Sequence, residues 1–122
     1  MKHMLDEDKP LFNQICQMIE DEIIRGRLRE GEQAPSTNQL AAFYRINPAT
    51  VMKGINLLVD EGILYKKRGI GMFVADGAKQ RLMENRKAIF FQEKVAALLN
   101  EAEKLGISSA EVIAMIKGER EL

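Results

Sequence analysis

The sequence is poor in the side chains that most enzyme and metal sites need. It holds one cysteine, Cys16, and one histidine, His3, among 122 residues. A single cysteine excludes an internal disulfide and fits a reducing compartment, so we expect a cytoplasmic protein. A Ser-His-Asp or Cys-His set would have to use His3, for which a solvated terminal residue is the simpler interpretation. No Cys/His cluster has metal-ligand spacing. We therefore expect a protein that is not an enzyme and holds no metal or cofactor.

Long hydrophobic runs are also missing. No apolar stretch approaches the roughly 20 residues of a membrane-spanning helix. No signal peptide is visible either, so we expect no membrane partner. Gly69-Ile70-Gly71 lacks the continuation of a phosphate-binding loop. The length and the 46% hydrophobic content fit one compact domain with a small appendage.

Neither sign of charge is in excess, because 18 Lys and Arg residues balance 18 Asp and Glu residues. Zero net charge alone argues against a nucleic-acid partner. The distribution argues for one, because five cations and only two anions lie between Tyr44 and Phe73. A local basic patch of this kind favours DNA binding that weakens strongly with salt.

The stretch from Ala34 to Val74 has the signals of a helix, a turn, a second helix and a hairpin. Ser36 and Gln39 form a capping box, which predicts a helix from Ser36 to about Arg45. Asn47 followed by Pro48 predicts the start of a second helix, which should run to about Glu61 and end at Gly62.

The second helix has two unlike faces. Val51, Ile55 and Leu58 recur at the spacing of a buried stripe. The opposite side carries small, polar and basic residues, which can enter a major groove: Ala49, Met52, Lys53 and Asn56. We expect the backbone N–H groups at the start of this helix, with Thr50 beside them, to be available to phosphate.

A basic hairpin follows. Two apolar runs, 63–65 and 72–74, flank Lys66-Lys67-Arg68-Gly69-Ile70-Gly71. The glycines permit the positive φ of a turn, and the three cations can contact phosphates or a minor groove. This layout is that of a winged helix-turn-helix.

The same stretch resembles the DNA-binding domain of GntR-type bacterial transcription regulators. Their pattern runs Leu-Pro-Ser-x-x-x-Leu-Ala, a recognition helix, Glu-Gly-Leu/Ile-Leu, and a Gly-x-Gly-Thr-Phe-Val wing. The corresponding elements are Ala34-Pro35-Ser36, Leu40-Ala41, Asp60-Glu61-Gly62-Ile63-Leu64 and Gly69-Ile70-Gly71-Met72-Phe73-Val74. The resemblance covers roughly residues 10–76, and Asn47-Pro48-Ala49-Thr50-Val51 with the short chain looks most like the YtrA-like subfamily.

This chain departs from the family pattern at several positions. Many members have Arg where Asn38 and Pro48 stand, and both positions often contact DNA in the family. Thr is usual at the position of Met72. A small residue, often Gly, is common where Arg45 stands.

Helices flank the winged module on both sides. Pro10 should open a helix that ends near Gly26, with its apolar face formed by Phe12, Ile15, Cys16, Ile19 and Ile23. On that face Cys16 is expected in the core, since no partner thiol or histidine is near it for redox work. After the wing, residues 78–105 should form one long helix, and a capping box at Ser108 and Glu111 should start a short helix that folds back as an αα-hairpin. The predicted fold class is α+β, mainly α, with a winged domain at 1–76 and a helical dimerisation segment at 77–122.

The long helix carries more apolar surface than this chain can cover. We expect a second copy to cover it, forming an isologous homodimer, although the stripe could instead fold back onto its own winged domain. The residues predicted to form this dimer surface are Leu82, Ile89, Phe90, Phe91, Val95, Leu98, Ala102, Leu105, Val112, Ile113 and Ile116.

The sequence thus predicts a homodimeric transcription regulator, a repressor, that reads a two-fold double-stranded DNA operator. The predicted DNA contacts are Ser36, Thr37, Asn38, Arg45, Asn47, Ala49, Thr50, Met52, Lys53, Asn56, Lys66, Lys67, Arg68, Gly69 and Gly71. Asn38, Ala49, Met52 and Asn56 are the candidates for base edges. Taken singly, each residue could as well serve a turn, a cap or a solvated surface, and the competing classes are a protein-binding winged helix and a nonspecific DNA-packaging protein. The resemblance implies a transporter operon as target. An effector site, whose ligand the sequence does not identify, would be small and at the dimer interface.

Overall fold

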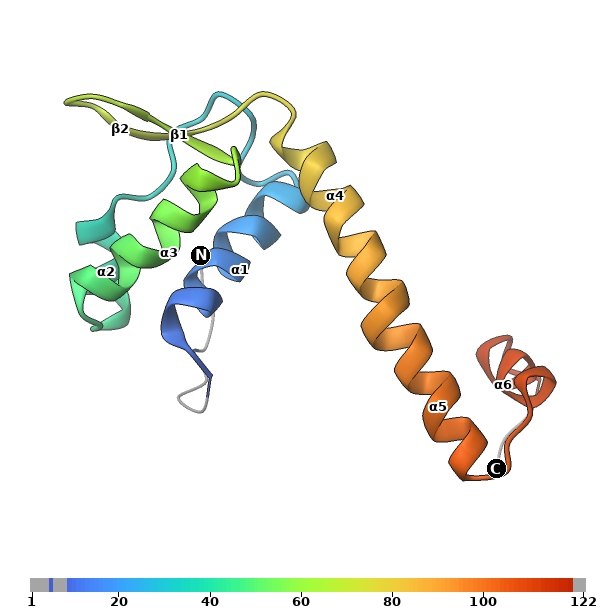
Figure 1. Ribbon diagram of the computed structural model, residues 1–122. Helices are drawn as coiled ribbons and strands as arrows, with labels where there is room; N and C mark the ends of the chain where they lie inside the picture. The colour runs from blue at the N-terminus through green and yellow to red at the C-terminus, as the bar shows by residue number, and fades with distance from the viewer. Residues whose placement is uncertain (1–4, 6–8, 120–122) are drawn as a thin grey trace. The chain divides into compact units, whose positions relative to one another are not determined.

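The computed structural model describes Leu5 and residues 9–119, so His3 and residues 120–122 lie outside the described part. The chain divides into two compact units, Met1–Met83 and Glu84–Leu122, each considered by itself (Figure 1). The elements, in chain order, are α1 (Leu11–Ile24), α2 (Thr37–Tyr44), α3 (Pro48–Asp60), β1 (Leu64–Lys67), β2 (Gly71–Val74), α4 (Ala78–Ile89), the π-helical η1 (Phe90–Val95), α5 (Ala96–Lys104) and α6 (Ser109–Ile116).

The first unit is a winged helix-turn-helix, which confirms the predicted fold class. Ser36 caps α2, and the reciprocal bonds with Gln39 complete the predicted capping box. Asn47 caps α3, with Pro48 at its first position. The turn between α2 and α3 passes through Arg45 in the left-handed conformation, at φ 55°.

The wing is an antiparallel hairpin in which Leu64 pairs with Val74 and Lys67 pairs with Gly71 (Figure 1). The segment 31–34 adds a third strand-like edge to β2, through the bonds Gly31 N to Val74 O at 2.8 Å and Ala34 N to Met72 O at 2.8 Å. The wing is therefore anchored on both sides: β1 continues from α3, and the segment before α2 holds β2.

The core of the first unit lies between α1, α3 and the sheet. Gly54 allows α1 and α3 to approach closely, because a Cβ at this position would stand 2.7 Å from the carbonyl oxygen of Phe12. The start of α4 also belongs to this core, where Ala78 and Leu82 are buried. The fully buried side chains of the core include Ile15, Met18, Ile19, Ile23, Val51, Ile55, Leu58, Ile63, Leu64, Val74 and Leu82.

The prediction of one uniform α-helix after the wing is wrong. Six residues, Phe90–Val95, form a π-helix, closed by the bond from Ala96 N to Phe91 O. In the second unit α6 contacts α5, and the capping box of Ser108 and Glu111 is formed as predicted. None of the helices in the described part of the chain is both long and apolar enough to cross a membrane.

Candidate nucleic-acid interface

One side of α3 is an exposed strip. Val51, Ile55 and Leu58 face the core, as predicted. Ala49, Met52, Lys53 and Asn56 are all exposed, and 51% of the Met52 surface is accessible. Together with Leu57 and Asp60, these residues line a shallow groove of about 380 Å³ along the helix. Among the described residues of the first unit, no other element covers this strip.

The backbone N–H groups at the start of α3, which the sequence predicted to be available to phosphate, are all hydrogen-bonded. Asn47 accepts from three successive amides: Ala49 N bonds to Asn47 Oδ1 at 2.9 Å, and the N–H groups of Thr50 and Val51 both bond to its carbonyl oxygen. Pro48, at the first helical position, has no N–H. The prediction of open N–H groups at this helix start is therefore wrong, because Asn47 satisfies all of them. Phosphate contacts at this end must come from side chains.

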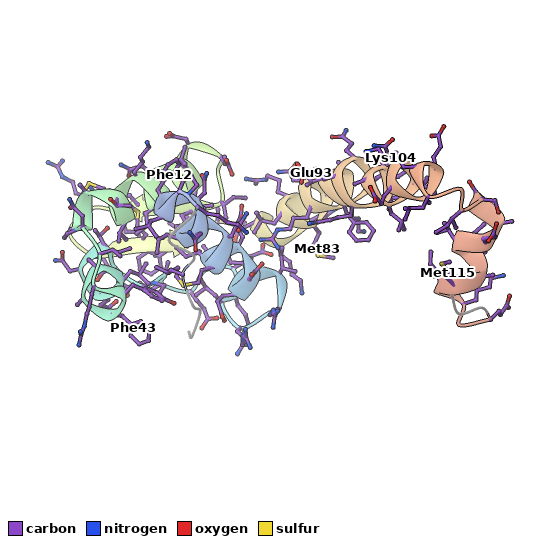
Figure 2. The ribbon with its side chains drawn as sticks, turned by 90° about the horizontal axis from the view of Figure 1, so that it is seen from below. Phe12, Phe43, Met83, Glu93, Lys104 and Met115 are labelled. Carbon is purple, nitrogen blue, oxygen red and sulfur yellow. The ribbon has the colours of Figure 1, made fainter. Side chains whose placement is uncertain are left out.

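Lys53 is held at the edge of the strip by an aromatic ring. Its Nζ lies 4.1 Å from the ring centroid of Phe12 on α1, a cation–π geometry. Figure 2 shows Phe12 on α1 beside α3. This contact directs the only cation of α3 toward α1.

The start of α2 keeps donors that α3 lacks. Ser36 Oγ accepts from Gln39 N at 3.0 Å, so its hydroxyl hydrogen can still donate to a phosphate. The amides of Thr37 and Asn38 occupy the first two helical positions, which have no intrahelical acceptor. This end of α2 therefore suits an anion better than the start of α3 does.

The wing presents its cations on two faces. Side chains alternate along a strand, and Leu64 and Val74 point into the core, so Lys66 shares their side while Lys67 lies on the other. The Lys67 ammonium stands 4.2 Å from the ring of Phe73. Only Arg68 lies in the turn, so Lys66 and Lys67 belong to β1 rather than to the turn.

Comparison with known proteins decides the family. The model of the bacterial regulatory proteins of the gntR family matches residues 11–74. The HTH-type transcriptional repressor YtrA of Bacillus subtilis is 31% identical over 108 residues, which are 88% of this chain and 82% of that protein. The chain belongs to the GntR family.

Comparison with solved structures leads to the same family. A putative GntR-family transcriptional regulator from Bacteroides thetaiotaomicron superimposes with a TM-score of 0.73 at 35% identity, over 88% of this chain and 94% of that one. The AraR DNA-binding domain, solved in complex with operator ORX1, superimposes with a TM-score of 0.53 at 30% identity over 62% of this chain and 92% of its own. This GntR protein is accordingly a DNA-binding transcription regulator and not an enzyme.

Several residues that hold the wing and the start of α4 in place were missed from the sequence. Gln33 Nε2 donates to Ile70 O at 3.1 Å and so ties the wing turn to the segment before α2. A Cβ at Gly71 would stand 2.6 Å from this Gln33 nitrogen, and φ at Gly71 is +147°. Arg81 on α4 donates to Gly62 O at 2.6 Å and to Asp76 O. The bonds Gln33 to Ile70 and Arg81 to Gly62 join residues far apart in sequence, and local patterns carry no signal for them.

Cys16 occupies the apolar face of α1, as predicted. Its Sγ donates to Gly54 O at 2.9 Å. Burial, with the nearby charges of Glu20 and Glu61, raises the pKa of the Cys16 thiol to about 11. At neutral pH the thiol is therefore protonated and a poor nucleophile.

The residues predicted for the dimer surface include buried, partly buried and exposed side chains. Leu82 is 2% exposed within the core of the first unit, and Ala102 and Val112 are buried in the second, so their surface is covered within the chain itself. Val95 is partly buried. The others are exposed large hydrophobics: Ile89, Phe90, Phe91, Leu98, Leu105, Ile113 and Ile116. Leu99, which the prediction omitted, is also exposed, at 42%.

Proposed function

We propose that this GntR protein is a homodimeric repressor that binds a two-fold DNA operator, with α3 of each copy in a major groove. The observation that carries the proposal is the uncovered strip of α3 next to a wing that holds three cations. A helix with an exposed small and polar face fits the major groove, and cations beside it fit the flanking phosphates.

The contacts divide by chemistry. The proposed contacts with base edges are made by four exposed residues of α2 and α3: Asn38, Ala49, Met52 and Asn56. Phosphate fits the donors and cations that surround this surface, and the turn glycines let the wing backbone approach. The proposed phosphate and backbone contacts are Ser36, Thr37, Arg45, Asn47, Thr50, Lys53, Lys66, Lys67, Arg68, Gly69 and Gly71.

The second copy is proposed to cover the exposed apolar side chains of the second unit. Phe90 and Phe91 are 61% and 66% exposed, and large exposed apolar patches mark interaction sites. Residues 1–76 would then serve DNA binding and 77–122 dimerisation, with Ala78 and Leu82 joining the two by packing in the first unit. Operator half-sites would lie about 34 Å apart, or a multiple of that distance.

The regulated genes are proposed to include a transporter operon, by resemblance to YtrA-like regulators. Deletion of the gene should raise transcription of such an operon if the protein represses it, and RNA sequencing of the deletion strain measures this. Lowered transcription would make the protein an activator.

The decisive test is binding of the full chain to the DNA upstream of its own gene, against a scrambled duplex, across a salt series. Tight, sequence-dependent binding by two chains per site supports the proposal. Equal affinity for both duplexes would favour a packaging protein or a wrong target. No binding even at low salt would favour a winged helix used for protein contact.

A further inference from the structure

The exposed strip of α3 has an unusual chemistry for a major-groove reader. Ala49, Met52 and Asn56 lie three and four positions apart, so they follow one face of the helix. All three are exposed and line the same groove. The seven helical steps from Ala49 to Asn56 cover about 10 Å, which corresponds to roughly three base pairs. Two of the three side chains are apolar and the third is an amide.

From this strip we infer that α3 recognises adenine–thymine base pairs, with Ala49 and Met52 packed on thymine methyl groups and Asn56 bonded to adenine. The inference rests on the proposed function and specifies the DNA that it binds. Thymine alone among the bases carries a C5-methyl group in the major groove, and apolar side chains contact it. The Asn56 amide can donate from Nδ2 to adenine N7 and accept at Oδ1 from the N6 amino group.

Guanine readout by α3 is disfavoured by the same geometry. The commonest guanine contact is a bidentate Arg or Lys, and α3 contains no Arg. Its one cation, Lys53, lines the same groove as Ala49, Met52 and Asn56, but its Nζ lies 4.1 Å from the Phe12 ring on α1, and this cation–π contact competes with a contact to guanine. Reaching guanine would require Lys53 to leave that ring.

The test replaces thymine by deoxyuridine, which removes the methyl group and leaves the base-pairing edge unchanged. The full chain first selects its preferred duplex from a random-sequence library, and footprinting marks the bases that it protects in the major groove. Affinity is then measured for that duplex and for its deoxyuridine analogue, with the wild-type chain and with Met52→Ala. Met52 is 51% exposed, so its replacement leaves the core intact.

We expect each lost methyl contact to weaken wild-type binding about fourfold. Met52→Ala should bind the thymine duplex more weakly but lose part of the deoxyuridine penalty, whereas the wing variant Lys66→Ala should keep that penalty in full. Protected positions without A·T pairs, or equal affinity for both duplexes, would overturn the inference while specific binding still upholds the proposed function. If the chain selects no sequence from the library, both the A·T inference and the proposed function are overturned.

Discussion

Arg45 is the one non-glycine residue with positive φ in the described part of the chain, and it stands in the turn that sets the angle between α2 and α3. A side chain in this conformation costs roughly 1–2 kcal/mol, because Cβ crowds the following carbonyl. The chain tolerates this strain at a position where Arg45 can also add positive charge near the α3 strip. The DNA contact proposed for Arg45 would thus be gained at the expense of stability.

Replacing Arg45 by Gly and by Ala should separate strain from charge, since both changes remove the guanidinium. Gly adopts φ 55° without crowding, whereas Ala keeps the strain. We expect the free energy of unfolding of Arg45→Gly to be about 0.5–1 kcal/mol higher than that of Arg45→Ala. Urea denaturation measures this difference. Equal stability of the two variants would mean that the turn carries no strain.

The Cys16 thiol makes stability depend on pH. Its pKa is raised from 9.0 to about 11 in the folded protein, so the folded state holds this proton after the unfolded state has lost it. The stabilisation is therefore fully present below pH 9 and is lost as pH rises through about 11. Ser in place of Cys16 can donate the same hydrogen bond to Gly54 O but does not ionise in this range.

Between pH 8 and pH 10 the wild type should lose on the order of 1 kcal/mol more unfolding free energy than Cys16→Ser. Urea denaturation at each pH measures this difference. Parallel pH profiles for the two proteins would show that Cys16 does not titrate differently on folding.

At the scale of elements, the wing depends on both its neighbours. The register of β1 and β2 places Lys66 and Lys67 on opposite faces, so the hairpin offers positive charge to either side. Gln33 fixes the turn from outside the hairpin. A wing held in this way can contact phosphates without first being ordered, which lowers the entropy lost on binding.

Replacing Lys66, Lys67 and Arg68 together by Ala should weaken binding to operator and random DNA alike. Each phosphate contact contributes about 0.9 to the slope of log K against log salt, so the slope should flatten by up to about 3. The matched control is Lys87, Lys94 and Lys104 to Ala, which removes equal charge from the second unit. Identical salt slopes in both triple variants would remove the wing from the interface.

At the scale of the whole molecule, the second unit is too small to bury its own apolar side chains. The π-helical segment Phe90–Val95 also redirects the apolar side chains. A residue inserted into a regular helix turns the side chains that follow it by roughly 100° about the helix axis. The dimer surface, which was predicted on one long helix, is thus divided at this segment. Seven of the residues predicted for the dimer surface are nevertheless exposed.

Phe90 and Phe91, replaced together by Ala, should convert a dimer to a monomer while each unit keeps its fold. Both side chains are more than half exposed, so the change removes little intrachain packing. The control is Phe43→Ala on α2 (Figure 2). The exposure of Phe43 is 61%, the same as that of Phe90. Sedimentation equilibrium at micromolar concentration measures the mass. A wild type that sediments as a monomer would refute the dimer.

The sequence alone determined the elements of the winged unit, since caps, glycine stops and apolar periodicity act within a few residues of one another. Ser36 with Gln39, Asn47 with Pro48, and the 51–58 stripe of α3 were all read correctly for that reason. Tertiary structure decided what distant partners supply: the Phe12 ring beneath Lys53, the Gln33 bond to Ile70, and the burial of Leu82. The bonds by which Asn47 satisfies the first amides of α3 are local as well, and the prediction of open N–H groups at that helix start overlooked them. Local rules specify which residues form a helix, and only packing specifies what each face touches.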